Sequence, residues 1–292
     1  MKRPSLKSFY LQNLKSDTLA ADEMINIYLM RPLASVIVWL LYPTRITPNH
    51  VTFFAILIGC IGAGVYLFET PLAAASAGTL VVMKDIFDDA DGQLARAKGQ
   101  YSRRGRFFDS IGDFVVDVLV FSAITAVVFH DHPSVLTIVL GFCSLAGITL
   151  RVSYHVYYQV SFLHRQNRYH LNRIVESVTD EDRLGDPVAL QLQRIFNVIY
   201  TWQDKLMAQT DRWCMRENID ERHLPVWYAD RFGLCLSGLL GFGTELFVLG
   251  VCSWFNQLYL YLWINVVGMN GFLLSSVLYR RYILSLNIPR KV

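Results

Sequence analysis

Residues 88–113 read DDADGQLARAKGQYSRRGRFFDSIGD, and they place four carboxylates at helical spacing between two apolar stretches. Asp88 and Asp91 are three residues apart, and Asp109 and Asp113 are four apart, so each pair lies on one face of its own helix. Two such helices side by side make a four-carboxylate pocket. The flanking stretches PLAAASAGTLVV and FVVDVLVFSAITAVVF have the composition of membrane spans, and ionisable residues in such a setting indicate a functional site.

We expect this pocket to bind divalent cations. Four anions this close cannot all stay ionised without compensation, and a hard cation that takes oxygen ligands supplies it. Mg²⁺ or Mn²⁺ has this chemistry, and two ions are accommodated as in two-metal phosphoryl transfer. Asp88, Asp91 and Asp109 are then metal ligands. Asp113 is the carboxylate best placed to take a proton from an acceptor hydroxyl, which makes it the predicted catalytic base.

The fixed spacing extends beyond the carboxylates. It reads Asp88-x-x-Asp91-Gly92-x-x-Ala95-Arg96, eight residues, and then Gly105-x-x-x-Asp109-x-x-x-Asp113. This pattern resembles, at every fixed position, the signature of the CDP-alcohol phosphotransferase family. The resemblance implies a metal-dependent transferase of phospholipid synthesis that moves a phosphatidyl or phosphoalcohol group from a CDP-linked donor to an alcohol hydroxyl and releases CMP. CDP-diacylglycerol is the expected donor, and a small alcohol or a lipid is the expected acceptor. The resemblance also implies a homodimer, and it implies that Asp113 is both the base and a ligand to one metal.

The small and basic residues of the motif are predicted to contact the nucleotide donor. Gly92 permits close approach of the backbone, and Ala95 keeps the wall of the site narrow. Arg96 can meet a phosphate with its planar guanidinium. Gly105 lets the second helix start close against the first. Taken alone, each glycine is more often a packing residue.

The segment TPNHVT at residues 47–52 comes just before the first apolar run. A helix N-cap formed by Thr47 or Asn49 explains it without any ligand. The segment also resembles the one that opens the first span in this family and lies near the nucleotide. Asn49 and Thr52 are therefore added to the predicted binding residues.

Further charged residues flank the motif. Asp85 lies one turn before Asp88 and is expected to pair with Lys84 or with an arginine of the next loop. Asp117 lies one turn beyond Asp113, and we expect it to be hydrogen-bonded inside the helix bundle.

Composition indicates a polytopic membrane protein, because hydrophobic residues make up 53% of the 292 residues and charged residues only 17%. Six stretches have roughly the 20 residues that a span requires. They are residues 51–69, 72–90, 107–130, 134–160, 229–254 and 257–279. We predict an all-α integral membrane protein with six transmembrane helices, an N-terminal interfacial helix within residues 22–43 and a helical cytosolic insertion.

Lys and Arg residues predict the topology. The short links at residues 70–71, 131–133 and 255–257 contain neither, whereas the alternate segments contain nearly all of them. The positive-inside rule then puts both termini and the active site in the cytosol. Membrane lipids are expected partners, and nucleic acid is not. The predicted division is a tail and interfacial helix (1–50), four spans with the Asp motif (51–163), the insertion (164–226), and two spans with a cytosolic tail (227–292).

The insertion has no role that the sequence assigns. A helix is predicted to start at Asp186-Pro187, and its apolar stripe is expected to pack on the bundle or on the membrane surface. The stripe consists of Val188, Leu192, Ile195, Ile199, Trp202 and Leu206.

The segment SYHVYY at residues 153–158 is used to predict whether the acceptor alcohol carries a phosphate. Family members with a phosphorylated acceptor carry positive charge where this chain has Tyr157 and Tyr158. We therefore expect an acceptor without a phosphate, although Arg165 and Arg168 could substitute as phosphate ligands.

The alternative function is a non-catalytic membrane carrier that uses the Asp cluster for proton or cation coupling. A carrier accounts for buried carboxylates. It gives no reason for Gly92, Ala95, Arg96 and Gly105 at their spacings.

Overall fold

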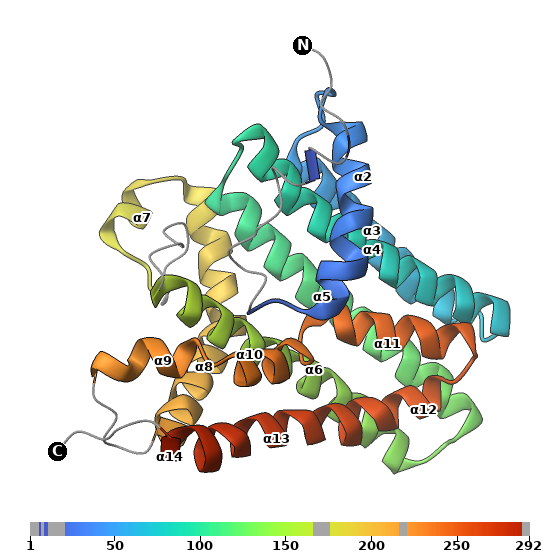
Figure 1. Ribbon diagram of the computed structural model, residues 1–292. Helices are drawn as coiled ribbons and strands as arrows, with labels where there is room; N and C mark the ends of the chain where they lie inside the picture. The colour runs from blue at the N-terminus through green and yellow to red at the C-terminus, as the bar shows by residue number, and fades with distance from the viewer. Residues whose placement is uncertain (1–5, 7–8, 11–20, 166–175, 216–220, 288–292) are drawn as a thin grey trace.

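The protein is described by a computed structural model for residues 6, 9–10, 21–165, 176–215 and 221–287 (Figure 1). Within these ranges it contains helices and no strand, which confirms the predicted all-α class. The helices in chain order are η2 (Asn26–Met30), α2 (Arg31–Leu41), α3 (Pro48–Tyr66), α4 (Pro71–Lys98), α5 (Arg103–Asp131), α6 (Val135–Arg165), α7 (Asp180–Leu184), α8 (Pro187–Met215), η3 (Glu221–His223), α9 (Leu224–Tyr228), α10 (Arg231–Gly238), α11 (Phe242–Trp254), α12 (Leu258–Trp263), η4 (Ile264–Met269), α13 (Asn270–Tyr279), η5 (Arg280–Leu284) and α14 (Ser285–Asn287). Most of the predicted N-terminal tail, Arg168 of the insertion and the last five residues lie outside the described residues.

Five helical segments of the described chain are long and apolar enough to cross a membrane. They are Pro48–Tyr66, Arg103–Asp131, Val135–Arg165, Leu224–Trp254 and Leu258–Leu284. Helix α4 is long enough, but its first 18 residues already include Lys84, Asp85 and Asp88. The sixth span therefore stays a prediction. The charged residues that make α4 less suitable as a membrane span lie in or next to the candidate site.

The turn between α4 and α5 brings the two halves of the Asp motif together. Helix α4 ends in a Schellman motif, in which Gly99 has φ 64°, its N–H donates to Arg96 O (3.3 Å) and Gln100 N donates to Ala95 O (2.9 Å). Ser102 then caps α5 by accepting from Gly105 N at 2.8 Å. Because the reversal takes only residues 99–102, α5 returns beside the end of α4.

Helices η2 and α2 occupy the stretch predicted as an interfacial helix. Helix α2 is fixed on α4 by Gln93, which accepts from Ser35 Oγ at 2.7 Å and donates to Arg31 O at 3.2 Å. Its other face exposes Leu33, Val36 and Leu40. The helix is thus present and amphipathic, and its position at the membrane interface stays a prediction.

The stretch predicted as one span at residues 229–254 is broken. Helices α10 and α11 are separated by residues 239–241, so the helix is interrupted there, although Leu224–Trp254 is long and apolar enough to cross a membrane as predicted. The carboxylate of Glu23 enters the break and accepts hydrogen bonds from Thr244 N (2.8 Å) and Thr244 Oγ1 (3.1 Å). A Cβ on Gly241 would overlap this carboxylate, so glycine is required there. Glu23 therefore caps α11 from 221 residues away in the chain.

The insertion is helical in its described part, and α8 crosses the ends of α5 and α6 at the left of Figure 1. Asp211 of α8 is fully buried and serves as its anchor. Its Oδ1 accepts from Tyr158 Oη (2.8 Å) and Trp227 Nε1 (2.9 Å). Its Oδ2 accepts from Tyr157 Oη (3.1 Å) and Tyr228 Oη (2.7 Å). One carboxylate thus joins α8 to α6 and α9.

The buried face of α8 is not the predicted apolar stripe. Its buried residues are Gln193, Gln203, Met207, Asp211 and Cys214, whereas Val188, Ile195, Trp202 and Leu206 of the stripe are exposed. Of the two predicted positions for the stripe, packing on the bundle is therefore wrong, and packing on the membrane surface stays a prediction. Buried hydrogen bonds outweighed apolar periodicity in choosing which face of the helix contacts α5 and α6.

Ion pairs hold the insertion against the start of α5. Glu176 pairs with Arg103 at 3.1 Å and with Arg106 at 2.5 Å. Asp182 also pairs with Arg103, and Asp186 pairs with Arg104 at 2.7 Å. The first turn of α5 contains no acidic residue, so the insertion supplies the negative charge that this helix N-terminus favours.

Loss of the Asp211 anchor should destabilise the protein. The change Asp211→Ala leaves four buried donors without their acceptor, and each such group costs about 1–3 kcal/mol. We expect the free energy of unfolding to fall by at least about 3 kcal/mol, measured by tryptophan fluorescence during denaturation in detergent. Asp180→Ala is the control, because that side chain is 94% exposed. Equal stability of the two variants would contradict the role of Asp211.

The Glu23 cap should make stability depend on pH. Burial raises the pKa of Glu23 from 4.5 to about 8. The folded protein binds this proton more tightly than the unfolded chain, so the associated stability is fully present below about pH 4.5 and is lost as the pH rises toward 8. We expect the apparent Tm of the wild type to fall more steeply between those values than that of Glu23→Gln. If the Tm of the wild type and that of Glu23→Gln changed with pH in parallel, titration of Glu23 would not contribute to stability.

Candidate metal centre

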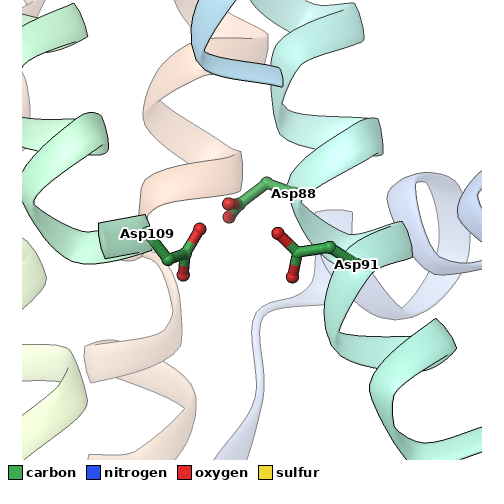
Figure 2. A group of neighbouring side chains, drawn as sticks. All are labelled: Asp88, Asp91 and Asp109. Atoms are coloured by element: carbon green, nitrogen blue, oxygen red, sulfur yellow. The ribbon is translucent and has the colours of Figure 1, made fainter. Parts of the chain in front are cut away.

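Three of the four predicted carboxylates converge. Each of Asp88, Asp91 and Asp109 offers an oxygen, and these three oxygens lie within 4.8 Å of one another. Figure 2 shows the carboxylates pointing toward a common point, two from α4 and one from α5. The spacing of three residues on α4 and the tight turn at residues 99–102 account for this convergence.

The geometry of the triad fits a small divalent cation. Mg²⁺ binds oxygen at about 2.0–2.1 Å, so ligands on opposite sides of it lie roughly 4.2 Å apart. The oxygen–oxygen separations in the triad do not exceed 4.8 Å, which is compatible with that span. No ion pair among the described residues involves Asp88, Asp91 or Asp109, so the protein itself supplies no direct cationic partner for them. When bound, a divalent cation there would offset the charge of the triad and of an incoming phosphate.

Thr52 positions one of the ligands. Its hydroxyl lies against Asp91 Oδ2, to which it donates a hydrogen bond, and it is also 3.2 Å from Pro48 O. Thr52 is 3% exposed and belongs to the first turns of α3. The structure thus places Thr52 against the carboxylate of a candidate metal ligand, whereas the position that the sequence predicts for it, beside the nucleotide, stays a prediction.

Asp113 lies one helical turn beyond Asp109 and outside the triad. Its Oδ1 forms an ion pair with Lys84 Nζ. The expected pairing of Lys84 with Asp85 is therefore wrong, because the side chain extends toward α5 instead. Lys84 is four residues before Asp88, so the sequence places both on the same face of α4, but it does not select Asp113 as the partner of Lys84.

The remaining motif residues line the same end of the bundle. A Cβ on Gly92 would have only one neighbour within 4 Å, Arg96 Nη1 at 3.5 Å, so the backbone there is open to a ligand. Ala95 lies in the same last turns of α4 and is half-buried. A Cβ on Gly105 would lie 2.5 Å from Asn49 Oδ1. Because glycine has no Cβ, α5 can start close against α3.

A cavity of about 710 Å³ lies between the start of α5 and the insertion. Asn49 and Phe107 line it on one side, and Glu181 and Gln193 line it on the other. The triad does not belong to its lining, so this cavity adjoins the metal centre without containing it. Asn49 faces both the cavity and Gly105, which leaves it accessible to a ligand.

Tyr157 and Tyr158 have a structural role. Both hydroxyls donate to Asp211, so the absence of basic residues at these positions is explained by the anchoring of α8. It therefore gives no information about the acceptor. Of the alternative phosphate ligands, Arg165 lies with its guanidinium 5.8 Å from the ring centre of Tyr228.

The motif residues also lie within a stretch of the chain that matches a known protein family. The family model described as CDP-alcohol phosphatidyltransferase matches residues 45–209. Three relatives each carry the name "Bifunctional IPC transferase and DIPP synthase". The one from Archaeoglobus fulgidus is 36% identical over 91 residues, which are 31% of this chain and 18% of the relative. The one from Thermococcus kodakarensis is 41% identical over 73 residues (25% and 16%), and the one from Rubrobacter xylanophilus is 33% identical over 117 residues (39% and 24%).

The matched stretches make up 16% to 24% of the length of these three relatives, so their names describe much longer proteins. The family match is broader. It covers more than half of this chain and includes the whole Asp motif together with Asn49 and Thr52. This multi-pass membrane protein belongs to the CDP-alcohol phosphatidyltransferase family.

Proposed function

We propose that the protein transfers a phosphatidyl or phosphoalcohol group from a CDP-linked donor to an alcohol hydroxyl, with a divalent cation held by Asp88, Asp91 and Asp109. The convergence of these three carboxylates is the observation that carries the proposal. CDP-diacylglycerol is the donor we favour, because the site lies at the ends of apolar helices that a lipid can approach. The product would serve phospholipid synthesis.

The reaction is a displacement at phosphorus. The acceptor oxygen forms a bond to the phosphorus that carries the lipid or alcohol, and the bond from that phosphorus to the CMP oxygen breaks. Arg96 is placed to hold a phosphate of the donor, beside the open backbone of Gly92. Asp113 takes the proton of the acceptor hydroxyl. Lys84 contacts Oδ1 of this carboxylate, so Oδ2 is the oxygen that would receive the proton.

The site is proposed to face the cytosol, with both termini on the same side. The distribution of Lys and Arg supports this orientation. The ion pairs of Arg103, Arg104 and Arg106 place the polar insertion at the same end of α5 as the metal centre. Membrane lipids are the remaining partners, and the homodimer stays a prediction.

Activity should require the metal. Purified protein in detergent is supplied with CDP-diacylglycerol, a panel of alcohols and Mg²⁺ or Mn²⁺, and CMP release is measured. Excess EDTA should abolish turnover. Asp91→Asn should lower it by at least about 100-fold, since several kcal/mol of charge stabilisation are lost. Asp131→Asn, at the exposed far end of α5, is the matched control and should keep wild-type activity.

Sustained CMP release in excess EDTA would contradict the metal centre. Absence of CMP release with every donor and alcohol, together with cation uptake into protein-containing vesicles, would favour the carrier. The same panel tests the expectation that unphosphorylated alcohols are better acceptors than phosphorylated ones.

Substitutions of Asp113 and Asp88 should have different effects on donor binding, because the two residues have different proposed roles. Asp113→Asn should lose about 10²- to 10⁴-fold in the chemical step, as removal of a general base typically does, and keep most of its donor affinity. Asp88→Asn should lose donor affinity as well, because a metal ligand is gone. Calorimetry with the donor and single-turnover CMP release distinguish the two. An equal loss of donor binding in both variants would make Asp113 chiefly a metal ligand.

A further inference from the structure

Lys84 is a buried cation at the centre of the site. Its side chain is 1% exposed, and its ammonium contacts Asp113 Oδ1. The ammonium also lies 4.5 Å from the ring centre of Phe242 on α11, a cation–π contact. A Cβ on Gly59 of α3 would lie 3.3 Å from Lys84 Cγ, so the stem is confined by that helix. Residues of α3, α5 and α11 therefore hold the ammonium in one place.

The charged groups of the site form two layers along the helices. Asp88, Asp91 and Asp109 make the outer layer, where their oxygens converge. Lys84 lies one turn before Asp88 on α4, and Asp113 lies one turn beyond Asp109 on α5, so these two make the inner layer. The outer layer holds three negative charges with no cationic side chain paired to it, whereas the inner layer carries one charge of each sign. Among the described residues, the outer layer is the group of carboxylates whose oxygens converge with no paired cationic side chain, so it is the place for a metal.

A second divalent cation at Asp113 would bind a carboxylate that already contacts the Lys84 ammonium. Both cations would then lie within a few ångströms of each other inside a buried site, where the repulsion of like charges is strong. The ammonium cannot withdraw to water, because its side chain is enclosed. The arrangement thus favours one divalent ion together with one fixed ammonium.

We infer that the Lys84 ammonium takes the place of a second divalent cation, so that the site binds one metal ion and Lys84 positions Asp113. This inference rests on the proposed function and makes Lys84 a positioning residue. Position 84 is not part of the motif from which two metal ions are predicted. Removal of the ammonium should therefore allow the site to bind a second ion.

The test is the stoichiometry of Mn²⁺ binding to the full chain in detergent, measured by calorimetry and by electron paramagnetic resonance without donor. The wild type should bind one Mn²⁺ per chain. Lys84→Met has similar volume without the charge, and it should bind two. Lys84→Arg keeps the charge and should bind one. Lys98→Met is the control on the same helix, because Lys98 bonds only the carbonyls of Thr44 and Ile46 in the described structure, and it should also bind one.

Two Mn²⁺ ions in the wild type, or a single one in Lys84→Met, would overturn the inference. The wild-type stoichiometry decides the matter even if Lys84→Met does not fold. Two ions with EDTA-sensitive CMP release would overturn this inference alone. Turnover that continues in EDTA, with no Mn²⁺ bound, would instead overturn the proposed function.

Discussion

A buried carboxylate needs positive charge or hydrogen-bond donors in contact with it, because low-dielectric surroundings penalise an isolated ion. Glu245 meets this need with Arg151 Nη2 at 2.8 Å and Tyr261 Oη at 2.9 Å. Asp211 meets it with four donors, and Asp113 with Lys84. The Asp88, Asp91 and Asp109 triad differs, since the described protein gives it one hydroxyl donor and no ion pair. Glu245, Asp211 and Asp113 are thus compensated by side chains of the protein, whereas at the triad a metal would supply the missing positive charge.

The insertion contributes to the site by fixing the helix that carries Asp109. Arginines in the first turn of a helix oppose the helix dipole, and α5 begins with three of them within four residues. Glu176, Asp182 and Asp186 offset these charges from outside. Arg106, one of the paired arginines, precedes Asp109 by less than one turn. The insertion therefore acts as a brace on α5, a role that its nearly balanced composition does not reveal.

Features encoded over short distances in the chain were predictable. The apolar runs located the long helices, and the spacings at residues 88–91 and 109–113 located the carboxylates on helix faces. Contacts between distant residues were not predictable from spacing. Lys84 could pair with several carboxylates, and the packing of α4 and α5 on α3 brings it to Asp113. The break at residues 239–241 had a signal in the closely spaced glycines 238, 241 and 243, but its partner Glu23 lies at the other end of the chain.

That partnership has a consequence for biosynthesis. Glu23 leaves the ribosome before Thr244, which follows 221 residues later. The N-terminal segment, including the Ala21 carbonyl that accepts from Gln159, cannot reach its final contacts until α6 and α11 have been made and inserted. Residues 21–23 therefore reach their final contacts only after these later helices are in place. A polypeptide truncated before α11 would keep Glu23 without its docking site, which gives a quality-control system a means of recognising incomplete chains.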